Sequence, residues 1–145
     1  MKKITQIITV LSLLVSFTFV QGQTKQEPWS SSQLMPPKQL ADRIQQAKTL
    51  MPLIVNIGPQ AVIKGSVDIG PADEKANLKK LETLLSKEDK NREVVLYCGC
   101  CPFDRCPNIR PAFSQIKKMG FKNAKLLDIP KNIKTDWIDK DYPVQ

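Results

Sequence analysis

Four cysteines follow an apolar run in the stretch Val94-Val95-Leu96-Tyr97-Cys98-Gly99-Cys100-Cys101-Pro102-Phe103-Asp104-Arg105-Cys106. Charged residues precede the run and a glycine ends it, which is typical of a buried β-strand. The 145-residue chain has no cysteine outside this stretch and no histidine anywhere. Ligands of open α/β sheets bind at the carboxyl ends of the strands. We therefore expect sulfur chemistry in the loop that begins at Cys98.

Predicted strands and helices alternate on both sides of this stretch. Apolar runs predict a short strand near Leu34, interior strands at 53–57 and 66–69, a strand that ends at Cys98, and a last strand at 124–129. Helical spacing predicts helices at 36–52, 72–86 and 107–119 and a short one around Trp137. This alternation predicts an α/β domain with a mostly parallel central sheet and helices on both faces.

The N-terminal residues predict export. Lys2 and Lys3 precede an apolar stretch at 4–20, and small or tolerated residues follow, which is typical of a signal peptide at 1–22. An uncleaved membrane anchor is the alternative, because the stretch is of marginal length for spanning a bilayer. Residues 23–33 are polar and predict a linker to a single domain at 34–145. We expect a periplasmic or secreted protein without membrane contact after cleavage.

The chain is basic, with a formal net charge of +8. Its lysines are spread along the predicted helices, which is typical of solvated helix faces. A nucleic-acid partner would be unusual for an exported protein in which aromatic residues make up only 6% of the sequence. We therefore expect small-molecule or protein-thiol partners and no nucleic acid.

The four cysteines predict a site rather than a set of structural disulfides. An even number of cysteines in an oxidising compartment is typical of disulfides, but four in one loop cannot join distant parts of a domain. A nucleophilic thiol must be largely thiolate. The predicted helix start at Pro107 and the side chains of Arg105 and Arg110 supply positive potential near the loop.

From about Leu34 to Val144 the chain resembles a rhodanese-like (sulfurtransferase) domain. The likeness is carried by residues 53–57, 63–69 (similar to the family's I-x-G-A-x-x-I), 94–98, 120–123, Trp137 and 141–144. The resemblance implies that a cysteine at the end of the central strand takes sulfur from a sulfane-sulfur donor as a persulfide and passes it to a thiol or cyanide. Cys98 occupies that position. Apart from the resemblance, Arg105 and Arg110 are the nearest fixed positive charges, and we expect them to bind a small anionic donor together with the loop backbone from Gly99. We expect no cofactor and no metal ligand.

Two features depart from that family's pattern. Asn56-Ile57-Gly58 stands where the family usually has Asp-x-Arg, and the loop after Cys98 is several residues longer and carries the three additional thiols. Cys100 stands five residues before Arg105, as the family's nucleophile often stands before its loop arginine. Cys100 is therefore a rival nucleophile to Cys98, with Cys101 a third candidate.

Other functions remain open on the sequence alone. In a thiol–disulfide exchange protein, Cys98 or Cys100 would attack and Cys101 or Cys106 would resolve the mixed disulfide. If one of the extra thiols instead resolves a persulfide at Cys98, an internal disulfide would form and sulfide would leave, and sequence separation favours Cys106 because vicinal Cys100–Cys101 pairing is strained. In a metal-binding module, three or four thiolates would hold Cu(I), zinc or an iron–sulfur cluster, although the spacing lacks two separate CxxC pairs. A noncatalytic binding domain is the last alternative.

Overall fold

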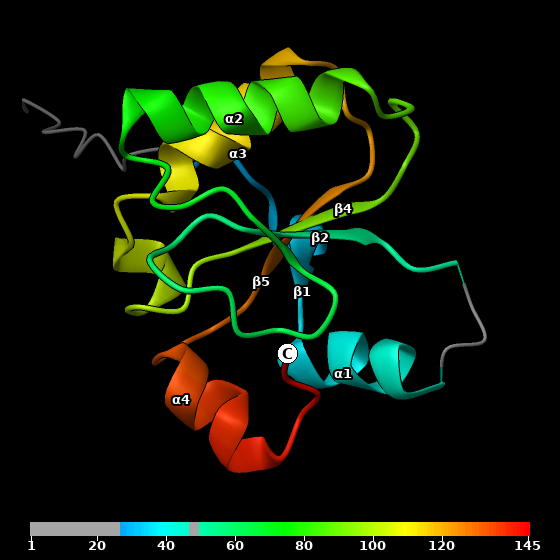
Figure 1. The fold of residues 1–145 in the computed structure, drawn as a ribbon, viewed down its shortest axis with the longest axis vertical. Coiled ribbons are helices and arrows are strands. Elements are labelled where there is room, and N and C mark those ends of the chain that lie inside the picture. Colours follow the sequence, from blue (N-terminus) through cyan, green and yellow to red (C-terminus); the bar gives the residue numbers. More distant parts are fainter. Residues whose placement is uncertain (1–26, 47–49) are drawn as a thin grey trace, which may run out of the picture.

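The computed structural model describes residues 27–46 and 50–145, which form five parallel strands and four α-helices (Figure 1). The strands are β1 (Leu34–Met35), β2 (Leu53–Asn56), β3 (Val67–Asp68), β4 (Val94–Tyr97) and β5 (Ala124–Leu127). They form one sheet in the order β1-β5-β4-β2-β3, and every pairing is parallel. The predicted signal peptide at 1–22 lies outside the described residues.

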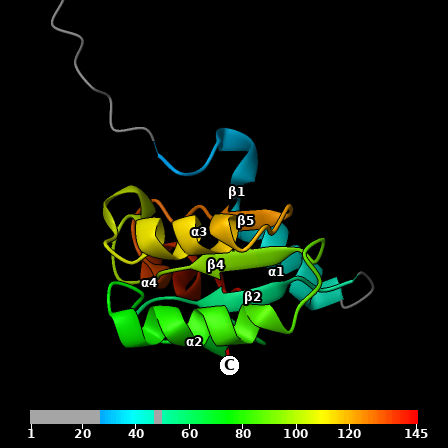
Figure 2. The same ribbon diagram turned by 90° about the horizontal axis from the view of Figure 1, so that it is seen from above.

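The helices cover both faces of the sheet, as expected (Figure 2). They are α1 (Pro37–Gln46), α2 (Lys75–Ser86), α3 (Ile109–Lys118) and α4 (Ile133–Asp136), with 3-10 turns η1 (Ser31–Gln33), η2 (Phe103–Arg105) and η3 (Ile138–Lys140). Helices α2 and α3 lie on one face, and α1 and α4 on the other. Among the described residues, no helix has the length and apolar character needed to cross a membrane.

The alternation of side chains along β4 divides the core into two layers. Val94 and Leu96 pack with residues of α2 and α3, whereas Val95 and Tyr97 pack with residues of α1 and with Trp137. All four side chains are buried because β4 is the central strand, between β5 and β2. Cys98 continues the α2–α3 side of the pattern immediately after the strand ends. The continuous apolar run thus reflects a strand that is covered on both faces.

Some predicted element boundaries and environments were wrong. The strand predicted at 66–69 as an interior strand is the edge strand β3, and both of its residues are exposed, because β2 is its only partner in the sheet. The predicted first helix was too long, since Met51 lies outside α1. Trp137 was predicted within a short helix, but it stands between α4 and η3 with a φ of −132° and is fully buried.

Residues 27–33 of the predicted linker pack against the domain. The ring of Trp29 lies 5.9 Å from that of Phe113 in α3 and 6.2 Å from that of Phe103 in η2. The Lys117 ammonium donates a hydrogen bond to the carbonyl of Pro28 at 2.8 Å. This segment therefore lies across the same helix and turn that follow the cysteines.

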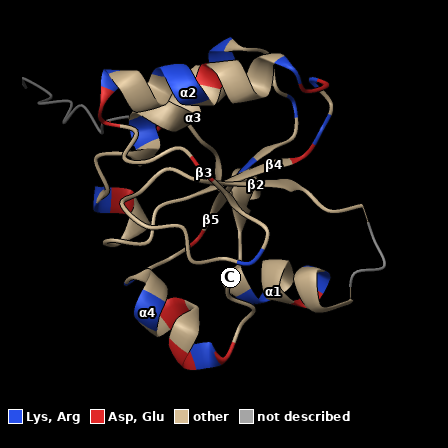
Figure 3. Cartoon of the chain, viewed as in Figure 1, with Lys and Arg blue, Asp and Glu red and all other residues tan. Residues whose placement is uncertain are grey.

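Basic residues are distributed over the surface rather than gathered in one strip. Figure 3 shows Lys and Arg on several helices and loops, interspersed with Asp and Glu. Several lysines are paired with acidic neighbours, among them Lys38 with Asp42 and Lys134 with Asp139. The described surface therefore matches the expectation of solvated helix faces.

Candidate functional site

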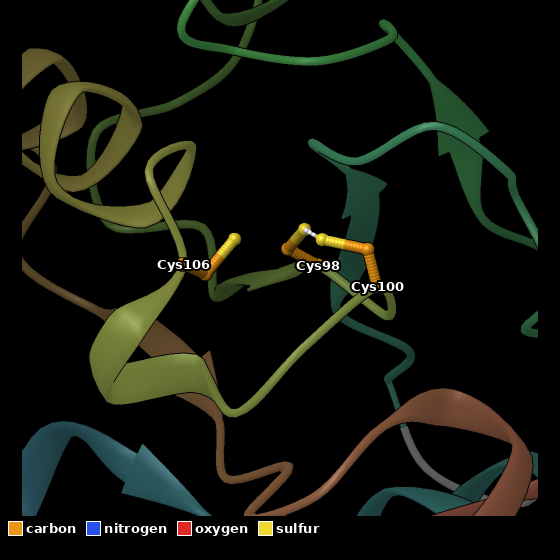
Figure 4. Close-up of side chains that lie close together, drawn as sticks. All are labelled: Cys98, Cys100 and Cys106. Atoms are coloured by element: carbon orange, nitrogen blue, oxygen red, sulfur yellow. Dashed lines mark hydrogen bonds between the residues drawn. The ribbon is translucent and has the colours of Figure 1, made fainter.

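Cys98 follows the central strand β4 at the carboxyl edge of the sheet, and only 1% of its surface is exposed. Its Sγ atom points into the layer that contains α2 and α3 (Figure 4). Gly58, just after β2, leaves the space that the sulfur fills, because a Cβ atom at this position would lie 2.8 Å from the Cys98 Sγ atom. The neighbouring strand therefore requires glycine at this point to accommodate the thiol.

Three sulfur atoms converge at this edge. The Sγ atoms of Cys98, Cys100 and Cys106 all lie within 4.8 Å of one another, with Cys98 between the other two (Figure 4). The Sγ atom of Cys100 is 3.3 Å from that of Cys98 and 3.2 Å from that of Cys101. All four thiols are free. Cys98 and Cys106 are buried, Cys101 is half-buried and Cys100 is exposed, so the sulfur atoms lead from the interior to the surface.

Asn108 belongs to the site although the sequence analysis did not identify it. Its Nδ2 donates a hydrogen bond to the Cys98 Sγ at 3.3 Å, and its Oδ1 accepts one from the backbone N–H of Asp73 at 3.0 Å. Asn108 precedes α3 but does not cap it: its backbone is helical, and its side chain makes no capping hydrogen bond. A buried asparagine at a helix start that does not cap the helix is available for another role.

The surroundings of Cys98 favour its thiolate. Its pKa falls to about 6 because the Cys106 thiol, the backbone N–H of Cys100 and the Asn108 amide hydrogen-bond to the charged sulfur, which outweighs the effect of burial. The pKa of Cys106 is raised, since its proton is shared with Cys98. Burial and the neighbouring sulfur atoms raise the pKa of Cys100 to about 12. At neutral pH the site therefore contains one thiolate between two thiols.

The two predicted arginines do not contribute to the low pKa of Cys98. Arg110 pairs with Glu27, donates to the carbonyl of Asp104 at 2.7 Å and stacks its guanidinium 5.5 Å from the ring centre of Trp29. Arg105 is exposed in η2. Neither guanidinium is among the groups that lower the pKa of Cys98. The thiolate is therefore stabilised by hydrogen bonds rather than by the arginines that the sequence suggested.

Gly99 has a packing role that the sequence analysis missed. Its carbonyl accepts a hydrogen bond from the backbone N–H of Ile133 at 2.9 Å. A Cβ atom on Gly99 would lie 2.5 Å from the Cβ atom of Ile133. The cysteine loop is also held by the backbone N–H of Phe103, which donates to the carbonyl of Ile129 at 3.0 Å. The chain that follows β5 thus fixes the position of the loop.

A small cavity opens beside the exposed thiol. It has a volume of about 90 Å³ and is lined by Pro59, Gln60, Gly99, Cys100 and Ile133. None of these side chains is charged. Two larger surface hollows among the described residues have no cysteine in their walls. Small molecules that enter this cavity would meet Cys100 before Cys98.

The sulfur cluster could also hold a metal. Cys98, Cys100 and Cys106 are the one group in the described part of the chain whose ligand atoms are close enough to share an ion. Thiolates select soft ions such as Cu(I) and zinc.

Comparison with protein-family models and with curated proteins gave no match for this chain. The structure itself establishes an α/β domain with a five-stranded parallel sheet and a cysteine cluster at the end of β4.

Proposed function

We propose that this protein is a rhodanese-like sulfurtransferase in which Cys98 holds transferred sulfur as a persulfide. The observation that carries the proposal is a hydrogen-bonded cysteine with a lowered pKa at the carboxyl end of the central parallel strand. A thiolate is the nucleophile that sulfur chemistry requires. The lowered pKa favours Cys98 over Cys100, whose pKa is raised to about 12.

The proposed reaction has two displacements. The Cys98 thiolate attacks the outer sulfur of a donor such as thiosulfate, the bond between the two donor sulfurs breaks, and sulfite leaves with the bonding electrons. The outer sulfur of the Cys98 persulfide is then attacked by an acceptor thiolate or by cyanide, and the products are an acceptor persulfide or thiocyanate. Cys98 leaves as a thiolate in the second step, and a low pKa makes it a good leaving group.

Cys98 and its neighbours divide the roles in this scheme. Asn108 and the backbone N–H of Cys100 hydrogen-bond to the Cys98 sulfur, which carries the negative charge before the first displacement and again after the second. Gly58 leaves room for that sulfur. The small uncharged cavity beside Cys100 favours a compact donor. We propose that Arg105 remains the side chain available to an anionic donor, since Arg110 is paired with Glu27.

Mass spectrometry of donor-treated protein tests the proposal. We expect one additional sulfur atom on the peptide that contains Cys98, removed by cyanide. Cys98→Ser should lose the adduct and sulfur transfer, whereas Cys101→Ser should keep the adduct because the Cys101 thiol is not among the groups that hydrogen-bond to Cys98. A persulfide that persists on Cys100 or Cys101 in the Cys98→Ser protein would move the nucleophile to that residue.

Thiol–disulfide exchange is the second candidate, and the short distances among the Cys98, Cys100 and Cys106 sulfurs favour it. Cys98 would attack a substrate disulfide and release one thiolate, and Cys106 would then attack the mixed disulfide and release the other. The resulting Cys98–Cys106 disulfide would need a dithiol reductant to return to the starting state. Under this scheme Cys106→Ser traps the mixed disulfide, whereas a plain sulfurtransferase keeps turning over with the same substitution.

We propose that the protein acts in the periplasm or outside the cell, as the first 22 residues indicate. N-terminal sequencing of the exported protein should find a start near Gln23. A protein that retains Met1 would overturn the proposal.

A further inference from the structure

The convergence of three sulfur atoms has a second chemical consequence. Three sulfurs that bind one ion in a plane, each at about 2.3 Å, lie about 4.0 Å apart. The Sγ atoms of Cys98, Cys100 and Cys106 lie within 4.8 Å of one another, and those of Cys98 and Cys100 are 3.3 Å apart (Figure 4). Changes of less than about 1 Å in these separations would therefore complete a trigonal site.

We propose that Cys98, Cys100 and Cys106 form a three-thiolate binding site for a single Cu(I) ion. The proposal rests on the arrangement of the three sulfurs and does not depend on sulfur transfer. It requires only that the reduced protein meets the metal.

The ligand set favours Cu(I) over zinc. Structural zinc is held by four ligands in a tetrahedron, and the chain has no histidine to supply one. The remaining cysteine, Cys101, contacts the Cys100 sulfur but does not belong to the group in which all sulfurs are within 4.8 Å. No carboxylate of the described residues belongs to this group either. Three sulfur ligands without a fourth suit a soft monovalent ion.

The groups around the sulfurs support binding of an ion. The Asn108 amide and the backbone N–H of Cys100 donate hydrogen bonds to the Cys98 sulfur. The backbone N–H of Asn108 donates a hydrogen bond to the Cys106 sulfur. Such donors orient the ligands and offset part of their negative charge. Cys98 and Cys106 are buried, whereas Cys100 is exposed. The exposed thiol gives the ion a path to the two buried ones.

Binding changes no oxidation state. Cu(I) remains monovalent, each thiol that becomes a ligand releases its proton to solvent, and three copper–sulfur bonds form. Because Cys98 is one of the ligands, the bound ion also blocks that thiolate toward other reagents. The metal-bound protein should therefore resist alkylation at Cys98.

Titration of the purified, fully reduced protein with Cu(I) under anaerobic conditions, in competition with bathocuproine disulfonate, tests the site. We expect one tightly bound Cu(I) per chain, with the luminescence of a solvent-shielded copper–thiolate centre. Cys100→Ser should weaken binding by at least about 100-fold, beyond the loss typical of an outer-shell change. Cys100 is exposed, so this variant should fold normally, as circular dichroism can verify.

Cys101→Ser is the matched control, because it removes the adjacent thiol and leaves the three proposed ligands in place. Its Cu(I) affinity should equal that of the unsubstituted protein, and Cys106→Ser should behave as Cys100→Ser does. Equal losses in all three variants, or tighter binding of zinc than of Cu(I), would overturn the proposal. Sulfur loading of the metal-free protein is measured separately, so failure of the copper site and failure of the proposed sulfur transfer are distinguishable.

Discussion

Tyr97 and Cys98 are consecutive residues, both almost fully buried, yet they face opposite layers of the core. The Tyr97 hydroxyl oxygen accepts hydrogen bonds from the backbone N–H groups of Val62 and Ile63 at 3.0 and 3.2 Å. Its proton is left for the Ser66 Oγ, 3.0 Å away. The Cys98 sulfur is surrounded instead by two other thiols and the amide of Asn108.

Burial has different consequences for these two neighbouring side chains. Around Tyr97, backbone groups with fixed protons satisfy the hydroxyl, and the result is a fixed position for the loop at 62–66. Around Cys98, two of the partners are thiols, whose protons can move and whose sulfurs can bond to one another. Burial on one face of β4 therefore stabilises the fold, whereas burial on the other face tunes a reactive group.

Replacing Cys98 should have the largest effect on the chemistry of the site. In Cys98→Ser we expect no persulfide after treatment with a sulfane-sulfur donor, because the hydroxyl is not ionised at neutral pH. The free energy of unfolding should change by no more than about 1 kcal/mol, since the serine oxygen can keep a hydrogen bond to Asn108. Mass spectrometry and urea denaturation measure the two effects. A large loss of stability would contradict the assignment of reactivity, rather than stability, to the Cys98 side of β4.

Replacing Tyr97 should instead destabilise the fold. Tyr97→Phe leaves the backbone N–H groups of Val62 and Ile63 without their acceptor, and we expect a loss of about 2–3 kcal/mol in the free energy of unfolding. Sulfur loading at Cys98 should remain. Tyr142→Phe is the control, because the Tyr142 hydroxyl makes no hydrogen bond within the described residues. If the two substitutions cost the same, the Tyr97 hydroxyl is not the source of the stability.

The pH dependence of sulfur loading tests the contribution of Asn108. In the metal-free protein, the rate of sulfur loading should fall as pH decreases through about 6, because Cys98 becomes protonated below its pKa. Asn108→Ala removes a hydrogen bond to the thiolate, so the pKa of Cys98 should rise toward its ordinary value of 9.0 and the midpoint should move to higher pH.

The ultraviolet absorbance of the thiolate checks the same shift without a substrate. An unchanged midpoint in Asn108→Ala would show that the other thiols alone set the pKa of Cys98. Cys98→Ser serves as the blank for this titration.

The smallest effect is expected at Arg110. Arg110→Gln should leave the KM for thiosulfate nearly unchanged, because its guanidinium is engaged by Glu27, the Asp104 carbonyl and the Trp29 ring. Arg105→Gln, at the exposed arginine of η2, is the comparison. A strong rise in KM for Arg110→Gln alone would return Arg110 to the role of an anion-binding residue.

Local patterns predicted much of the fold. The apolar runs at β2 and β4 are buried on both faces, and such strands have no polar alternation to mislead the prediction. β3 was wrongly assigned to the interior because Val67 and Asp68 have a short, mixed pattern that fits several environments, and only the order of the strands makes it an edge. The end of α1 was misplaced because apolar residues at helical spacing continue past the helix.

The sequence by itself determined that four thiols follow a buried strand, because that information lies within the thirteen consecutive residues 94–106. It could not select Cys106 and Cys100 as the thiols nearest Cys98, since η2 folds the loop back before α3 begins. Asn108, Gly58 and the pairing of Arg110 with Glu27 were likewise decided by tertiary structure. These partners come from separate segments, and hydrogen bonds, steric fit and charge depend on distances that only packing sets.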